Sequence, residues 1–197
     1  MLGIFLDTET NGLNPFKHRV VEIAFQMVDM ETGAVVDSYE AVLFQSYEEW
    51  QKSDLQSLAV NGFDWEQVSY GLRLETVADQ IRACFTKNKI CRGESVFICQ
   101  NPSFDRAFFG QILSTDLQEE LLWPYHWLDL ASMHWALSLK KKDPQDYPWK
   151  TGLSKDKIAK AYLLPKEKTP HRAMNGVLHL IACYEAVVGF PLKTKSS

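Results

Sequence analysis

The sequence predicts an α/β domain in which a mixed β-sheet is flanked by helices. Three apolar stretches, residues 2–7, 20–28 and 35–44, have strand character, and short turns join them. We therefore expect an antiparallel meander. Two shorter strand-like stretches, 95–99 and 127–129, are each followed by a helical segment, which is typical of strands that complete a mixed sheet with helices on both faces.

The spacing of apolar side chains distinguishes the strands from the helices. Residues 20–28 alternate between apolar and polar side chains, as a strand with two different faces does. Residues 74–85 repeat apolar side chains every three or four positions, as an amphipathic helix does. Asn101 is expected to cap the next helix, and Pro102 suits its first position. We expect further helices at residues 102–113, 130–139, 153–163 and 171–188.

Length and composition fit one domain. The chain has 197 residues, and 46% of them are hydrophobic, enough for a sizeable core. We expect a single domain over residues 1–188 and a short frayed tail over residues 189–197. The chain lacks a signal-peptide pattern, a bilayer-length apolar run and C-x-x-C pairs. These absences favour a cytoplasmic protein that does not enter a membrane.

Charge is distributed unevenly along the chain. The net charge of −4 argues against a protein that coats nucleic acid through a broadly basic surface. Between residues 140 and 172, however, ten Lys or Arg residues stand against four Asp or Glu residues. Such a stretch is often only a solvated helix face and loop. It is also what a polyanionic substrate would need beside an acidic, cation-binding site.

Asp7 and Glu9 are the first candidate site residues. They end the first apolar run, and side chains alternate along a strand, so both should project from the same face, roughly 6.6 Å apart at Cα. No Lys or Arg lies nearby in the sequence to neutralise them. A divalent cation would relieve their repulsion, and hard oxygen ligands suit Mg²⁺ or Mn²⁺. The simpler alternative is a pair of solvated acids beside a turn.

Two more residues extend this site. Asp105 falls in the first turn of an expected helix, where an acid also interacts favourably with the helix dipole. If the first strand and this helix start are neighbours, Asp105 joins Asp7 and Glu9 around a metal. His171 stands at the expected start of the last helix, behind the basic stretch. From there an imidazole could take a proton from a metal-activated water.

At these positions the chain resembles the DEDDh family of 3′–5′ exonucleases. This family includes the proofreading subunit of bacterial replicative polymerases, RNase T and oligoribonuclease. Residues 7–13 (DTETNGL) resemble its first motif, residues 101–105 (NPSFD) its second, and residues 171–173 (HRA) the start of its third. Three further stretches fit in order, namely residues 58–63, 127–131 and 152–154.

The resemblance implies a ribonuclease-H-like fold and removal of nucleoside monophosphates from the 3′ ends of DNA or RNA, using two Mg²⁺ or Mn²⁺ ions. It implies Asp7, Glu9 and Asp105 as metal ligands and His171 as general base. The substrate-binding residues it implies are Thr10, Leu13, Asn61 and Phe104. The expected partner is a single-stranded or frayed 3′ end. The sequence does not decide between DNA and RNA, nor whether the chain forms a homodimer or joins a replicative polymerase.

Gly176 departs from the family pattern, which has a fourth metal-binding Asp five residues after the histidine. Three explanations are open: another group such as Asn175 completes the metal shell, activity is weak or depends on Mn²⁺, or the chain binds 3′ ends without cutting them. A binding module for 3′ ends or a polymerase is therefore the alternative function, and an unrelated phosphoesterase a third. If the missing acid limits turnover, Gly176→Asp should raise activity in Mg²⁺.

Overall fold

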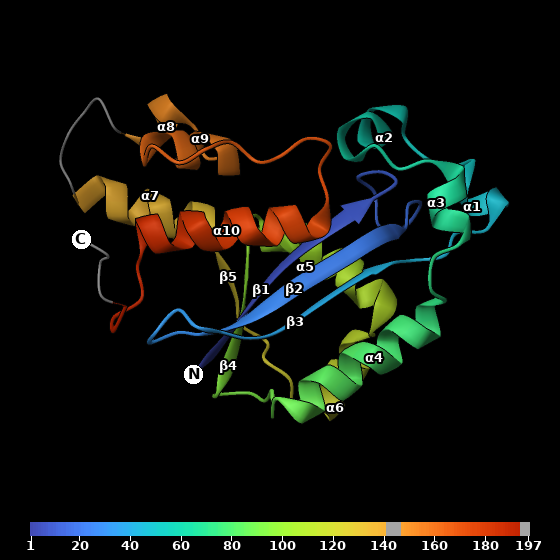
Figure 1. Ribbon diagram of the computed structural model, residues 1–197, viewed down its shortest axis with the longest axis horizontal. Helices are drawn as coiled ribbons and strands as arrows, with labels where there is room; N and C mark the ends of the chain where they lie inside the picture. Colours follow the sequence, from blue (N-terminus) through green and yellow to red (C-terminus); the bar gives the residue numbers. More distant parts are fainter. Residues whose placement is uncertain (141–146, 194–197) are drawn as a thin grey trace.

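The computed structural model describes residues 1–140 and 147–193 and contains a five-stranded mixed sheet (Figure 1). The strand order is β3-β2-β1-β4-β5. β2 and β3 run antiparallel to their neighbours, whereas β4 and β5 run parallel to theirs. The predicted meander and mixed sheet are confirmed. The strands are β1 (Leu2–Thr10), β2 (Val20–Asp29), β3 (Val35–Val42), β4 (Ser95–Cys99) and β5 (Trp127–Asp129).

Helices cover both faces of the sheet and one of its ends. The first face carries α4 (Leu74–Lys87), α5 (Pro102–Ile112) and α6 (Thr115–Glu120). The second face carries α7 (Leu130–Lys140), α9 (Lys155–Ala161) and α10 (Ala173–Val187), with the short α8 (Pro148–Thr151) beside α7 and α9. At the end of the sheet where β1 finishes lie α1 (Tyr47–Trp50), α2 (Leu55–Asn61) and α3 (Trp65–Ser69) (Figure 1).

The alternation of side chains along β1 decides which residues face which layer. Ile4 and Leu6 are fully buried in the core shared with α4 and α5. Phe5 is fully buried in the opposite core, against α10. By the same alternation, Asp7 and Glu9 lie on the α10 side of the sheet, and Thr8 lies on the α5 side.

The pairing of β1 leaves room for a site at its carboxyl end. β1 pairs with β2 from Leu2 to Thr10, but with β4 only from Leu2 to Phe5. Beyond Phe5, therefore, the edge of β1 that faces β4 has no strand beside it. The chain leaves β4 at Cys99 and enters α5 at Pro102, which brings the first turn of α5 next to this exposed edge.

Several helices differ from the prediction. α1, α2, α3, α6 and α8 were not predicted, because a helix of four to seven residues is too short to show an apolar repeat. Asn101 occupies the predicted N-cap position before Pro102, but it has a left-handed backbone (φ +60°), and its side chain makes no capping hydrogen bond. α10 begins at Ala173 rather than His171, and Glu22 Oε2 accepts from Ala173 N at 2.7 Å.

None of the helices in the described ranges is both long enough and apolar enough to span a bilayer. Residues 194–197 of the expected tail, and residues 141–146 of the basic stretch, lie outside the described part of the chain.

Candidate active site

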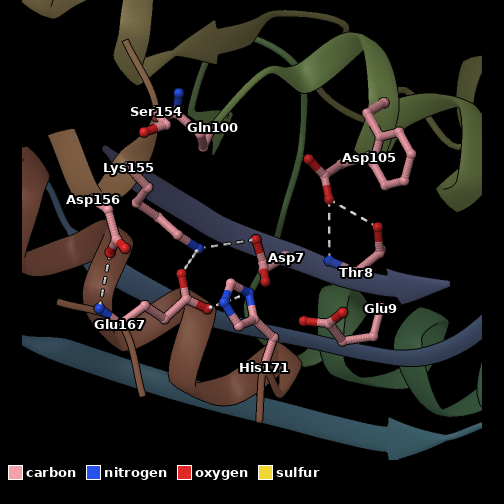
Figure 2. Close-up of a pocket in the computed structure, with 11 residues that line it drawn as sticks. Asp7, Thr8, Glu9, Gln100, Asp105, Ser154, Lys155, Asp156, Glu167 and His171 are labelled. Carbon is pink, nitrogen blue, oxygen red and sulfur yellow. Dashed lines mark hydrogen bonds and ion pairs between the residues drawn. The ribbon is translucent and has the colours of Figure 1, made fainter. Parts of the chain in front are cut away.

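A pocket of about 320 Å³ opens beside the carboxyl end of β1 (Figure 2). Asp7 and Glu9 reach it from β1, Asp105 from the first turn of α5, and His171 from the segment just before α10. All four predicted catalytic residues therefore line one cavity, although they come from three distant parts of the sequence. Their roles as metal ligands and general base stay predictions.

Asp105 is held against β1 by Thr8. Thr8 donates to Asp105 Oδ1 twice, from its backbone nitrogen at 3.0 Å and from its hydroxyl at 2.8 Å. The predicted proximity of the first strand and this helix start is thus confirmed. Because both bonds end on Oδ1, Asp105 Oδ2 receives neither of them and can accept from a ligand in the pocket.

The three acids are poorly neutralised. Burial, reinforced by the charge of Asp7, raises the pKa of Glu9 to about 8. Burial also raises the pKa of Asp105, again with a contribution from Asp7, and the hydrogen bonds from Thr8 only partly offset this. The pKa of Asp7 is raised by burial despite the opposing charge of Lys155. Desolvated carboxylates that repel one another favour the binding of a cation.

Lys155 and Glu167 belong to the same pocket, and the sequence did not indicate either. Lys155 Nζ lies 3.4 Å from Asp7 Oδ1 and 2.9 Å from Glu167 Oε2. Burial disfavours the charged amine, but Asp7 and Glu167 outweigh it and raise the pKa of Lys155. Burial likewise opposes ionisation of Glu167, yet His179 and Lys155 lower its pKa to about 2. This ion pair is therefore charged throughout the neutral pH range.

Gly176 faces this ion pair from α10. A Cβ built on Gly176 would overlap Asp7 Oδ2 and would lie 3.1 Å from Lys155 Nζ. An acid at this position therefore has no room unless Asp7 and Lys155 move. Even if the missing acid limits turnover, Gly176→Asp alone is therefore expected to displace Asp7 rather than to raise activity.

His171 is positioned mainly by α2 and the residues that follow it. Its backbone nitrogen donates to Val60 O at 3.1 Å, and the guanidinium of Arg172 lies 3.7 Å from the centroid of the Phe63 ring. The Nδ1 atom of His171 faces Glu167 Oε1 at 3.6 Å, a distance longer than a hydrogen bond. The imidazole is about one-third exposed, so a water or substrate in the pocket can reach it.

Gly62→Ala is expected to weaken both the fold and the positioning of His171. Gly62 ends α2 with φ +66°, and a Cβ there would lie 2.9 Å from Pro170 Cβ, next to His171. A left-handed non-glycine residue costs about 1–2 kcal/mol, which urea denaturation would measure. Gly93→Ala is the matched control, since Gly93 has φ +88° but no atom within 4 Å of its added Cβ. Only Gly62→Ala should also lower turnover; equal turnover in the two variants would contradict this positioning.

The four predicted substrate residues separate into two groups. Thr10 and Asn61 are buried, and their polar atoms bond internally: the Thr10 hydroxyl donates to Gly12 O, and Asn61 Nδ2 donates to Thr10 O. These bonds shape the turn after β1, and the roles of both residues as substrate contacts stay predictions. Phe104 lines the pocket, and Leu13 is 74% exposed on the neighbouring loop.

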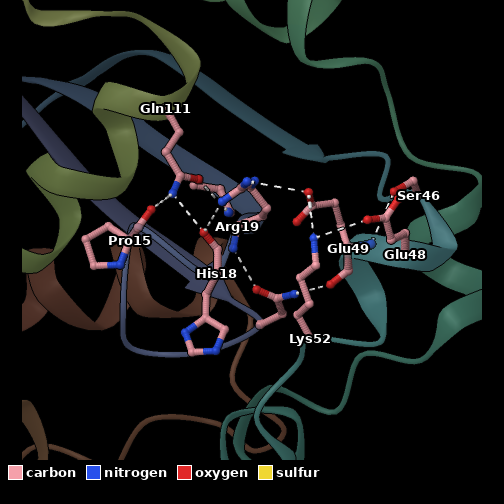
Figure 3. Close-up of polar contacts among 10 residues, drawn as sticks. Pro15, His18, Arg19, Ser46, Glu48, Glu49, Lys52 and Gln111 are labelled. Atoms are coloured by element: carbon pink, nitrogen blue, oxygen red, sulfur yellow. Dashed lines mark hydrogen bonds and ion pairs between the residues drawn. The ribbon is translucent and has the colours of Figure 1, made fainter.

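The loop that carries Leu13 is tied down by polar contacts (Figure 3). Gln111 Nε2 donates to Pro15 O at 2.8 Å and to His18 O at 2.9 Å. Asn11 Oδ1 accepts from Arg19 N at 2.7 Å. Leu13 and Phe16, which is 92% exposed, are thus apolar side chains held in solvent by a fixed loop.

The donor set suits a hard divalent ion. Asp7, Glu9 and Asp105 supply carboxylate oxygens, the ligands that Mg²⁺ and Mn²⁺ prefer. Within residues 1–140 and 147–193, however, no three His, Cys, Asp or Glu side chains are already close enough together to hold an ion. Binding would therefore require these carboxylates to draw closer to one another, with the ion taking the place of the protons that their raised pKa values retain.

Comparison with known proteins gives the family. E. coli exonuclease I in complex with a dT13 oligonucleotide has a similar structure, with a TM-score of 0.72 and 17% identity over 96% of this chain and 41% of that chain. A zinc-bound E. coli exonuclease I–ssDNA complex gives a TM-score of 0.71 and 17% identity, over 94% of this chain and 40% of that chain. This chain thus spans about two fifths of the length of those proteins.

No curated protein matches the sequence. The family model of the RNase T type, described as exonuclease, matches residues 4–184. The chain therefore belongs to the RNase T exonuclease family.

Proposed function

We propose that this chain is a metal-dependent 3′–5′ exonuclease that removes nucleoside monophosphates from single-stranded or frayed 3′ ends. The observation that carries the proposal is the convergence of Asp7, Glu9, Asp105 and His171 on one pocket. The raised pKa values of the three carboxylates support a cation there. Family membership supports the reaction class.

Each site residue has one task in this proposal. Asp7, Glu9 and Asp105 would hold Mg²⁺ or Mn²⁺, which polarises a phosphoryl oxygen and acidifies a bound water. His171 turns Nδ1 toward Glu167, which leaves Nε2 to accept the proton of the attacking water. The resemblance implies two ions, and this number stays a prediction.

The surroundings of the pocket suit a nucleic-acid end. Phe104 at the pocket, and Leu13 and Phe16 on the adjoining loop, offer apolar surfaces on which unpaired bases can stack without regard to sequence. The similar E. coli exonuclease I structures contain single-stranded oligonucleotides, which supports a substrate of this kind. DNA and RNA both remain candidates.

The direct test uses single-stranded DNA and RNA of equal length, each labelled at the 5′ end. Progressive shortening in Mg²⁺ or Mn²⁺, with release of mononucleotides and no reaction in EDTA, is the expected result. Oligonucleotides whose last phosphodiester linkage at the 3′ end is replaced by an analogue that resists hydrolysis serve as the polarity control. Hydrolysis of small phosphate esters but of no oligonucleotide would contradict the proposal and favour an unrelated phosphoesterase.

His171→Gln is expected to lower turnover about 10²-fold, the lower end of what a general base contributes. The substitution removes the proton acceptor but keeps a polar side chain of similar size. Single-turnover rates with a 5′-labelled oligonucleotide would measure it. His126→Gln, an exposed histidine before β5, is the control and should not change the rate. Unchanged turnover in His171→Gln would exclude this residue as the base.

A 3′-end-binding module is the second candidate, and Gly176 with Lys155 favours it. No acid occupies position 176, and the Lys155 ammonium already partly neutralises Asp7. If this function is the correct one, the chain would bind oligonucleotides with a free 3′ end in EDTA and would cut none in Mg²⁺ or Mn²⁺. Fluorescence anisotropy with 3′-free and 3′-blocked oligonucleotides separates the two functions.

A further inference from the structure

The Lys155 ammonium lies inside the carboxylate pocket rather than at its rim. It contacts Asp7 Oδ1 at 3.4 Å and Glu167 Oε2 at 2.9 Å (Figure 2). It also donates to Gly176 O at 3.3 Å. The Lys155 side chain is only 12% exposed, and that of Glu167 only 3%. Lys155 is thus a buried cation with three oxygen neighbours, and one of these oxygens belongs to Asp7, a proposed metal ligand. The ammonium and a divalent ion would therefore compete for the same carboxylate.

Glu167 fixes the position of this ammonium. Its backbone nitrogen donates to Asp156 Oδ1 at 3.1 Å, which ties the Glu167 segment to α9, the helix that carries Lys155. Its carboxylate also faces His179 Nδ1 at 3.6 Å and His171 Nδ1 at 3.6 Å. The ion pair is therefore held from α9, from α10 and from the segment between them.

Gly176 provides the space for the ammonium. The carbonyl oxygen of Gly176 accepts from Lys155 Nζ, and any side chain at this position would crowd both Lys155 and Asp7. The missing side chain and the inserted cation thus occupy the same corner of the pocket. Asp7 faces Lys155 there, while Glu9 and Asp105 form no ion pair with this lysine and line other parts of the pocket.

We propose that Lys155 is a positioning residue that substitutes for one divalent ion, so that this pocket binds a single ion beside Asp7. A second divalent ion on the Lys155 side of Asp7 would meet a fixed positive charge a few ångströms away, and the burial of Lys155 and Glu167 limits the screening of this repulsion by water. The inference rests on the proposed function, because it assumes that Asp7 is a metal ligand. It differs from the two-ion arrangement that the family resemblance implies.

The number of bound ions tests this inference without any turnover. Mn²⁺ is titrated into the metal-free protein, and bound Mn²⁺ is counted by electron paramagnetic resonance and isothermal titration calorimetry. We expect one tight Mn²⁺ per chain in the wild type and in Lys155→Arg, which keeps the charge. Two tight ions in the wild type would overturn the inference, because Lys155 would then have moved away and freed Glu167 as a ligand.

The affinity of the single ion supplies a second readout. Removing only one member of a buried ion pair often unfolds a protein, so Lys155→Met is combined with Glu167→Gln to keep the net charge constant. This double variant should bind Mn²⁺ at least about fivefold more tightly than the wild type, because the ammonium that it loses contacts Asp7 directly, whereas the carboxylate that it loses contacts Lys155 rather than Asp7. A smaller gain would overturn the inference. Lys160→Met, an exposed lysine on the same helix, is the control and should bind as the wild type does.

The outcomes distinguish this inference from the proposed function. Two tight ions together with mononucleotide release would leave the exonuclease proposal standing and remove only the role of Lys155. No bound Mn²⁺ at all would contradict both. If the double variant does not fold, the ion count in the wild type and in Lys155→Arg decides alone.

Discussion

Asp7→Asn is expected to lower turnover by about 10³-fold while leaving the fold intact. Burial raises the pKa of both Glu9 and Asp105, the charge of Asp7 raises both further, and Asp7 also pairs with Lys155. It therefore stands at the centre of the site. Loss of a metal-binding carboxylate removes several kcal/mol of transition-state stabilisation, and each 1.4 kcal/mol is about a tenfold change in rate. Lys155 keeps Glu167 as a partner, so its charge is not left unpaired.

The rate is measured in single-turnover reactions with a 5′-labelled oligonucleotide at saturating Mn²⁺, and the fold is checked by the thermal unfolding midpoint. Asp116→Asn is the matched control: Asp116 is an exposed acid in the first turn of α6, away from the pocket. It should retain full activity. If Asp7→Asn kept more than a tenth of the wild-type rate, Asp7 would not be an essential ligand.

Metal-free protein is expected to become less stable as the pH rises from about 5 to about 8. Glu9 ionises near 4.5 when exposed, but its pKa is about 8 in the folded chain. Between these values the folded state holds more protons than the unfolded state, so the free energy of unfolding falls with rising pH. At about 1.4 kcal/mol per pKa unit, the upper limit for Glu9 alone is about 5 kcal/mol.

Other buried groups act in the same direction. The pKa values of Asp7 and Asp105 are also raised, mainly by burial. His179 contributes over the upper part of the range, because contacts with Cys183 and Glu167 raise its pKa to about 10 and its folded-state charge is stabilising. As the pH rises through that range, this stabilisation is progressively lost.

Urea denaturation in EDTA at several pH values measures this effect. Glu9→Gln, which cannot ionise at this position, should remove a large part of the pH dependence. Addition of Mg²⁺ or Mn²⁺ near pH 8 should restore the stability of the wild type, because a ligand that binds only the folded state stabilises it. Equal stability at both ends of the pH range in EDTA would show that these carboxylates are not desolvated in solution.

The part of the site that the sequence predicted depends on local rules. Asp7 and Glu9 share a face because side chains alternate along a strand, and nothing beyond the strand itself was needed for that inference. Asp105 stands in the first turn of a helix that the sequence predicts, and the structure supplies the pairing of β4 with β1 that brings this turn to Asp7 and Glu9. Regular geometry over a few residues is visible in a single sequence.

The rest of the site depends on contacts between distant segments. Lys155 meets Asp7 across 148 positions, and Glu167 lies in a segment without regular structure. No periodicity marks either residue. In the sequence Lys155 is one member of a basic stretch, whereas in the structure it is a buried member of the acidic pocket. The motif places Asn61 at the substrate, and only the structure shows that this side chain also donates to Thr10 O.

Anomalous diffraction from crystals soaked in Mn²⁺ tests the central claim most directly. The account predicts an anomalous peak within coordination distance of the Asp7 carboxylate, bounded by Glu9 or Asp105, with His171 on the open side of the pocket. Strong manganese peaks elsewhere in the crystal, with none beside Asp7 at full soaking concentration, would contradict it.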